Sequence, residues 1–172
     1  MPGARDTEAH TRGQRGPVPI GAAALVIAVA GSSLAAVGAR QLSHRDHTSS
    51  LRQTALTAGR QIAVDFSAYD YRELQQDFNR VINESTGGFK SDFQRQSATV
   101  QDIIVRVKAV STAEVASAGV VSVTPTAATV LVAVNRTVKN TSAPNGQSDS
   151  FGLQLNLQRD HGRWLVSRVT QL

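Results

Sequence analysis

The sequence predicts an α+β protein in which one membrane-spanning helix precedes a domain whose helices come before an antiparallel sheet. Three observations support this prediction. Residues 16–39 carry no charged side chain, apolar residues between 48 and 108 recur every three or four positions, and apolar residues after 109 recur every second position. The first period is typical of amphipathic helices and the second of half-buried strands. Three helices packed on a curved four-stranded sheet are therefore expected.

Residues 16–39 are the predicted membrane span. The stretch is 24 residues long and lies between Arg15 and Arg40. A helix of that length reaches about 36 Å, which is enough to cross a hydrocarbon core of about 30 Å. We therefore expect residues 1–15 to be a disordered, polar cytoplasmic head, residues 40–47 to be a membrane flank, and residues 48–172 to be the folded domain.

The order of these segments also predicts the topology. Arginine residues flank the span equally, so the positive-inside rule gives no preference. A short head before a folded domain is typical of a signal-anchor, which predicts a single-pass protein of the cytoplasmic membrane with its C-terminal domain outside the cytoplasm. A cleaved signal peptide is the alternative, because Val37 and Ala39 are small enough for a processing site.

Three domain helices are predicted. The first covers residues 48–66. Asp70 and Glu73 have the spacing of a capping box, which starts the second helix at Asp70, and Gly87-Gly88 ends it. The third helix runs from Phe89 to about Lys108. The apolar stripes of the three helices are Leu51, Ala55, Ala58, Ile62 and Phe66; Leu74, Phe78, Val81 and Ile82; and Phe89, Phe93, Val100, Ile103, Ile104 and Val107.

Four strands follow. They are predicted over residues 112–124, 128–139, 151–158 and 163–170. The first contains Gly119, which is placed for a bulge, with Val115, Val121 and Val123 expected as its apolar residues. Residues 124–126 form a turn, residues 140–150 a polar loop, and residues 160–162 a tight turn.

The composition limits the classes of function. Residues 46–172 hold 13 Lys and Arg against 11 Asp and Glu, so the domain lacks the basic excess of a nucleic-acid-binding protein. Cysteine is absent, which excludes disulfides and thiolate chemistry. The four histidines have no spacing typical of a zinc site. The sequence therefore predicts no metal, no cofactor and no nucleic-acid partner.

The inward face of the two clearest strands provides the candidate ligand-binding residues. This face is apolar and contains no carboxylate, so it suits an apolar ligand or a packed core. Arg136 is in phase with the valines and is placed to meet a ligand carboxylate, or else a neighbouring acid. Trp164 is a candidate for ligand stacking or for a core anchor. The candidate site is Arg136, Val132, Val134, Leu153, Leu155 and Trp164.

An acidic and aromatic group near the first helix junction is a second candidate. It consists of Asp65, Tyr69, Asp70, Tyr71 and Asp77. Such groups are able to perform acid–base chemistry. Helix capping and solvation are the simpler interpretation.

Several short motifs together resemble one family of actinobacterial proteins. They are FSAYDY at 66–71, TGGF at 86–89, AGVVS at 118–122, ATVLV at 128–132 and GRWLVS at 162–167. With the preceding apolar segment, they resemble the Mce-associated membrane proteins of actinobacteria over residues 17–172. That family is one of those with the NTF2-like, or SnoaL-like, cone-shaped fold.

The resemblance implies an accessory, non-catalytic subunit of an Mce-type lipid-import system. Its domain would act outside the cytoplasm as a protein-interaction scaffold, and its partners would be the lipid bilayer, Mce transporter subunits or a permease, and an apolar lipid ligand. A VirB8-like secretion-system scaffold is one alternative, because this fold behind one membrane helix also occurs there. A lipid-binding or SnoaL-like pocket protein or enzyme is the other.

Overall fold

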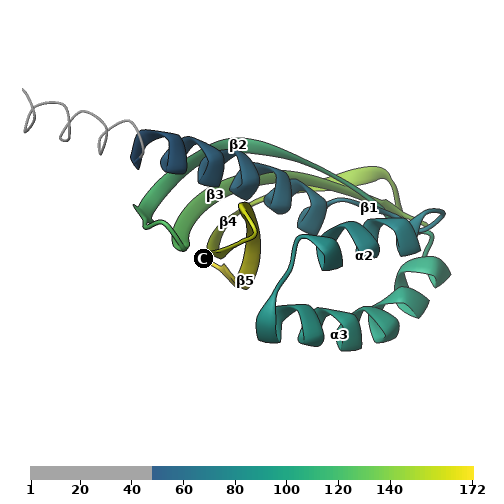
Figure 1. Ribbon diagram of the computed structural model, residues 1–172. Helices are drawn as coiled ribbons and strands as arrows, with labels where there is room; N and C mark the ends of the chain where they lie inside the picture. Colours follow the sequence, from purple (N-terminus) through teal and green to yellow (C-terminus); the bar gives the residue numbers. More distant parts are fainter. Residues whose placement is uncertain (1–47) are drawn as a thin grey trace, which may run out of the picture. The chain divides into compact units, whose positions relative to one another are not determined.

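The computed structural model describes residues 48–172 (Figure 1). The predicted head, membrane span and membrane flank (residues 1–15, 16–39 and 40–47) lie outside the described residues. Within residues 48–172, no helix is both long and apolar enough to cross a membrane. The described chain begins in a helix over residues 48–67, followed by β1 (Tyr69–Asp70), α2 (Leu74–Asn83), α3 (Gly87–Arg106), β2 (Val110–Val123), β3 (Ala127–Asn140), β4 (Ala143–Asp160) and β5 (Arg163–Gln171).

The α+β class and the helix-then-sheet order are confirmed, but the predicted number of strands is wrong. The sheet has five antiparallel strands in the order β1-β2-β3-β4-β5. The extra strand, β1, has two residues, and it pairs Tyr69 with Ser111 and Asp70 with Val110. A strand this short shows no period along the sequence.

The predicted polar loop over residues 140–150 is also wrong. β4 starts at Ala143, and only residues 141–142 form the turn, where the side-chain oxygen of Asn140 accepts hydrogen bonds from the amides of Ser142 and Ala143 at 2.9 Å. Residues 143–150 pair with the end of β3 and are polar on both faces. Without an apolar face, this half of the strand gave no period-2 signal.

The bulges of β2 do not fall at Gly119. The register shifts between Val115 and Ser117 and again between Val120 and Ser122, whereas Gly119 pairs with Leu131 in register. Val121, one of the apolar residues expected in this strand, lies at the second bulge and is 59% exposed. A bulge adds one residue and so turns the side chains after it to the other face.

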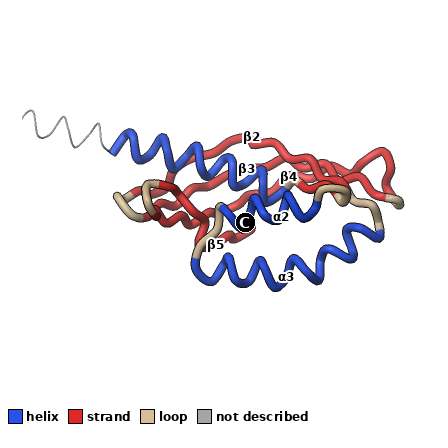
Figure 2. The backbone as a smooth tube through the Cα atoms, turned by 45° about the vertical axis from the view of Figure 1, so that its right-hand side comes forward, coloured by secondary structure: helices blue, strands red, loops and turns tan. Residues whose placement is uncertain are grey.

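The first helix packs along the sheet, as both ribbon and tube views show (Figures 1 and 2). Its apolar stripe meets the apolar face of β3, β4 and β5 in one continuous core. The fully buried large side chains of this core all come from the sheet: Val130, Val134, Leu153, Leu155, Leu157 and Val166; the helix contributes the buried residues Leu51, Ala55, Ile62 and Ala63. Gly59 lies so close to the sheet that an added Cβ would be 2.8 Å from a methyl group of Val130.

The predicted capping box is not formed. α2 begins at Leu74 rather than Asp70, and its N-cap Glu73 makes no side-chain cap hydrogen bond. The Asp70 carboxylate instead binds its neighbour Arg72, at 2.5 Å. The amide of Asp70 donates to the carboxylate of Asp77 at 2.7 Å, so a side chain of α2 fixes the position of β1, which precedes it in the sequence.

The prediction that Gly87-Gly88 ends the second helix is wrong, because α2 ends at Asn83 and both glycines belong to the first turn of α3. Gly87 has a φ of +59°, which favours glycine, and α3 starts there. The junction between α2 and α3 binds the edge of β5, because the amide of Val166 donates to the Glu84 carbonyl at 2.7 Å and the amide of Thr86 donates to the Val166 carbonyl at 2.9 Å. Of the twenty residues of α3, only Ile104 is buried.

Candidate functional site

The centre of the concave sheet face is a packed core. Four of the predicted ligand-binding residues lie in this core: Val132, Val134, Leu153 and Leu155, each at most 2% exposed. They contact the first helix and one another. Of these four, Leu153 also lines a cavity together with Arg136, and Val132 lines another hollow together with Gly152.

Trp164 is buried in the same core. It is 7% exposed, and its indole Nε1 donates to Thr54 Oγ1 of the first helix at 3.1 Å. The Arg159 guanidinium lies 5.8 Å from the centre of its ring. The structure therefore places Trp164 as an anchor between β5 and the first helix.

Arg136 lies where the apolar face ends. Its guanidinium pairs in bidentate fashion with Asp149, with Nε to Oδ1 at 3.1 Å and Nη2 to Oδ2 at 2.5 Å. The same group lies 4.8 Å from the centre of the Phe151 ring. The hydrogen bonds from Arg136 hold the pKa of Asp149 below its ordinary value. Asp149 is not recognisable from the sequence pattern, because it lies in the stretch predicted to be a loop.

A cavity of about 250 Å³ opens beside Arg136, between the first helix, α3 and the sheet. We call it the Arg136 cavity. Its apolar wall is mostly aromatic, and its polar groups are Arg136, Ser67 and Gln171; the apolar residues are Phe66, Phe89, Phe151, Leu153 and Val169. Ser67 is 4% exposed, and its Oγ has no hydrogen-bond partner among the described residues.

A second cavity, of about 310 Å³, lies along α3. We call it the phenylalanine cavity, because it is lined by Phe66, Phe78, Phe89 and Phe93, together with Val100 and polar residues of α3. Phe66 and Phe89 line both cavities. The rings pack with centroid distances of 5.7 to 6.3 Å. The sequence predicted these phenylalanines only as members of the apolar faces of the three helices. Periodicity shows which residues share a face, but it does not show where neighbouring elements leave part of that face uncovered.

The acidic and aromatic group at the first helix junction is held by arginines. Arg80 pairs with Asp77 at 2.5 Å and with Asp65 at 3.3 Å, and Asp70 pairs with Arg72. The bonds from Arg72 lower the pKa of Asp70. Among residues 48–172, no group of three or more metal-binding side chains is placed to hold a metal ion. These contacts fit the structural interpretation of the group.

Glu84, which the sequence did not single out, lies beside this group at the end of α2. Burial, the charge of Asp65 and a hydrogen bond with Asp65 raise the pKa of Glu84 to about 7, against the opposing charges of Arg163 and Arg80. One of its carboxylate oxygens is buried without a hydrogen-bond partner in the described chain. This carboxyl group therefore titrates near neutrality.

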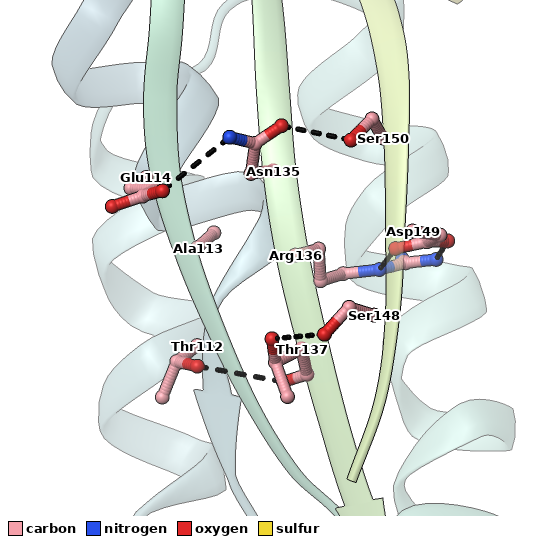
Figure 3. Close-up of a pocket in the computed structure, with 9 residues that line it drawn as sticks. All are labelled: Thr112, Ala113, Glu114, Asn135, Arg136, Thr137, Ser148, Asp149 and Ser150. Atoms are coloured by element: carbon pink, nitrogen blue, oxygen red, sulfur yellow. Dashed lines mark hydrogen bonds and ion pairs between the residues drawn. The ribbon is translucent and has the colours of Figure 1, made fainter.

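Residues 112–114 of β2, 135–137 of β3 and 148–150 of β4 line a hollow of about 680 Å³ (Figure 3). Two rows of polar side chains cross these three strands on the outer face of the sheet. In one row, Asn135 donates to Glu114 at 3.3 Å and accepts from Ser150 at 2.8 Å. In the other, the hydroxyls of Thr137 and Ser148 are 2.8 Å apart. These hydrogen bonds between strands stabilise the part of the sheet where residues 143–150 of β4 pair with the end of β3.

The fold is similar to those of several solved structures. An IcmL-like type IV secretion system protein from Legionella pneumophila aligns with a TM-score of 0.56 at 10% identity, over 68% of this chain and 88% of that one. A periplasmic fragment of TraM aligns with a TM-score of 0.54 at 12% identity, over 67% and 92%. The periplasmic domain of DotI aligns with a TM-score of 0.54 at 13% identity, over 68% and 91%. This likeness concerns the fold, which agrees with the expected NTF2-like class.

By its sequence, the chain belongs to the family described as "Uncharacterized protein Rv1363c/MT1408-like", whose profile matches residues 18–172. The protein Rv1363c of Mycobacterium tuberculosis (strain ATCC 25618 / H37Rv) is 29% identical over 119 residues. The match covers 69% of this chain and 46% of that relative, so this chain matches slightly less than half of the relative's length.

Proposed function

We propose that this chain is an accessory, non-catalytic membrane protein whose domain binds partner proteins of a cell-envelope assembly. The assembly that we favour is an Mce-type lipid importer, with the domain outside the cytoplasm. The surface of α3 carries this proposal. Three of the six exposed large apolar side chains of the described residues lie in its last two turns: Val100, Ile103 and Val105, at 43%, 57% and 45% exposure. Val100 and Ile103, three residues apart, lie on the same side of the helix, and apolar side chains grouped on a protein surface are typical of interaction sites.

The filled interior supports binding rather than turnover. Val130, Val134 and Leu155 have no exposed surface, so the face that carries catalytic groups in pocket enzymes is closed by packing here. The charged groups at the first helix junction are paired with one another. A scaffold needs a stable core and a free surface, and both are present in residues 48–172.

Two observations support the location and the assembly. The apolar stretch over residues 16–39 is long enough for a membrane anchor. Two solved structures of similar fold are described as periplasmic, and one as a type IV secretion system protein. The Mce assignment depends on the motifs that resemble Mce-associated membrane proteins.

Affinity purification of the tagged full-length protein from detergent extracts of its own host tests the proposal. We expect Mce or permease subunits to co-purify, and Ile103→Lys to reduce their recovery at least tenfold because a charge replaces an apolar contact. Val121→Lys is the matched control, since Val121 is equally exposed but lies on β2. Recovery of no envelope subunit, with other baits succeeding, overturns the proposal.

A secretion-system scaffold is the second candidate, and the fold similarity to an IcmL-like protein favours it. The same purification separates the two candidates by the identity of the partners. Secretion components in place of Mce subunits would assign the chain to secretion while leaving its role as a scaffold intact.

A further inference from the structure

The Arg136 cavity contains a cation that is held in position and still has free donors. A guanidinium has five N–H groups, and Asp149 takes two of those of Arg136. Stacking on Phe151 and the bidentate pair fix the plane of the group. Three N–H groups therefore have no partner in this ion pair, and a carboxylate, like a phosphate, is an oxygen group whose geometry a guanidinium matches.

Ser67 provides a second, independent observation. It lines the same cavity, is 4% exposed, and its hydroxyl has no hydrogen-bond partner among residues 48–172. Its backbone carbonyl is occupied, because it accepts from Ser111 Oγ at 2.7 Å. Buried hydroxyls are seldom left without a partner, since the loss of water is then uncompensated. The hydroxyl oxygen is itself buried, so it would have to rotate toward the cavity to bond a ligand oxygen near Arg136.

The remaining wall suits a hydrocarbon chain. Phe66, Phe89 and Phe151 face the Arg136 cavity, and Phe66 and Phe89 also line the phenylalanine cavity. Phe66 and Phe89 therefore stand between the two cavities, and a chain that starts at Arg136 would have to pass these two rings to reach α3. Only one of the twenty residues of α3 is buried, so few of its side chains are packed against the rest of the domain. A hydrocarbon chain bound along α3 would gain contacts with side chains that are now partly exposed.

We propose that the Arg136 cavity binds the carboxylate of a single-chain amphiphile, such as a fatty acid, with Arg136 and Ser67 holding the head group and the phenylalanine cavity holding the chain. The buried centre of the sheet is not part of this site. The inference does not depend on the proposed scaffold function, because it stands on Arg136, Ser67 and the phenylalanines, although Val100 belongs to both surfaces.

Photo-crosslinking of the full-length protein in phosphatidylcholine vesicles tests the site. The probe is palmitic acid with a diazirine in its chain, and crosslinked peptides are mapped by mass spectrometry. We expect saturable labelling of peptides that contain Phe66, Phe89 or Phe93, with unlabelled palmitate competing at least tenfold better than palmityl alcohol. Labelling confined to residues before 48 overturns the site, and equal competition by acid and alcohol overturns the role of the carboxylate.

Two substitutions on the ion pair give opposite expectations. Arg136→Gln removes the cation and should raise the half-saturating probe concentration about tenfold. Asp149→Asn removes the competing carboxylate and should lower that concentration several-fold. Asp149 is half exposed, so both variants are expected to fold, which circular dichroism checks. A shift in the same direction for both variants contradicts the proposal.

Ser67→Ala separates binding from folding. It removes a hydroxyl that has no partner in the free protein, so the thermal midpoint should be unchanged or higher, whereas probe binding should weaken several-fold. Glu114→Gln, on the outer face of the sheet, is the matched control and should change neither quantity. If Ser67→Ala leaves binding unchanged, the hydroxyl has no part in the site.

Discussion

Glu84 joins three elements at a point where its charge is poorly compensated. It ends α2, its backbone carbonyl binds the edge of β5, and its side chain faces Asp65 of the first helix. The two carboxyl groups are compatible when they share a proton and repel each other when both are ionised. Arg80 and Arg163 offset only part of that repulsion, because the pKa of Glu84 remains raised to about 7.

This arrangement predicts that the domain loses stability as pH rises from about 4.5 to about 7. Below this window Glu84 is protonated in both states, and within it the folded state alone keeps the proton, so unfolding becomes easier with rising pH. The loss should be about 1–2 kcal/mol, because solvent screens a half-exposed group. Glu84→Gln should remove this part of the pH dependence and stabilise the protein above pH 7.

Thermal unfolding of the full-length protein in detergent measures this effect, with the single tryptophan, Trp164, as the fluorescent reporter. Glu114→Gln is the control, since Glu114 is an exposed carboxylate of the outer face. If the thermal midpoint of Glu84→Gln changes with pH between 4.5 and 7 as steeply as that of the unmodified protein, Glu84 does not determine the pH dependence of stability. If Glu114→Gln changes the pH dependence of the thermal midpoint as much as Glu84→Gln does, the effect is likewise not specific to Glu84.

At the scale of elements, the closest approach between helix and sheet is at Gly59. A Cβ there would lie 2.8 Å from one methyl carbon of Val130 and 3.3 Å from the other, and Val130 has no exposed surface into which to move. We expect Gly59→Ala to destabilise the domain by about 1–2 kcal/mol, because overpacking outweighs the gain of about 1 kcal/mol in helix propensity.

Denaturant unfolding measures this difference. Gly88→Ala is the matched control, because Gly88 also lies in a helix and an added Cβ there meets no atom within 4 Å. In a Val130→Ala background, Gly59→Ala should no longer destabilise, since the methyl groups that it meets are absent. A loss of the same size in both backgrounds would assign the effect to the helix alone.

The elements that the sequence predicted well are those with one covered face. The first helix, β3 and β5 were placed within about two residues, since the core imposes a regular apolar period on each. The first half of β4 was missed because residues 143–150 pair with β3 beyond the helices, where both faces are polar. Arg136 was correctly placed in phase with the valines, but its partner Asp149 was hidden within that missed half-strand.

The candidate site shows the same limit. The inward direction of Val132, Val134, Leu153 and Leu155 follows from alternation, and the structure confirms it. Whether such a face is hollow or filled depends on how closely the helix approaches, and one of the contacts that permit this approach is at Gly59. Ser67 and Glu84 were not found because a buried polar atom without a partner is a property of three-dimensional packing, and no local pattern marks it.

At the scale of the whole molecule, burial is unevenly distributed among the helices. The first helix supplies four fully or nearly fully buried residues to the main core, whereas α3 buries only Ile104, which belongs to a separate small cluster with Leu74 and Ala109. The rest of the α3 stripe is half-buried phenylalanine or exposed aliphatic residues. Local stability follows the apolar area that an element buries.

Amide hydrogen exchange should therefore be faster in α3 than in the first helix or the β3–β4 pair. We expect the amides of residues 92–102 to exchange through local opening at least 100-fold faster than those of residues 55–64, a difference of about 2.7 kcal/mol in opening free energy. Exchange followed by mass spectrometry on the full-length protein measures both peptides in one experiment. Equal protection of the two helices would show that α3 opens only with the whole domain.

The same uneven burial connects the two proposals in one testable way. α3 buries only one of its twenty residues. It would gain apolar contacts from a protein partner bound at Ile103, and also from a ligand in the phenylalanine cavity. Each should therefore slow amide exchange in α3 more than in the other elements. Palmitate should protect mainly residues 89–100, whereas a captured envelope subunit should protect mainly residues 100–106. Protection that appears first in the β3–β4 pair would place the functional surface on the sheet, and α3 would then be only a loosely packed cover.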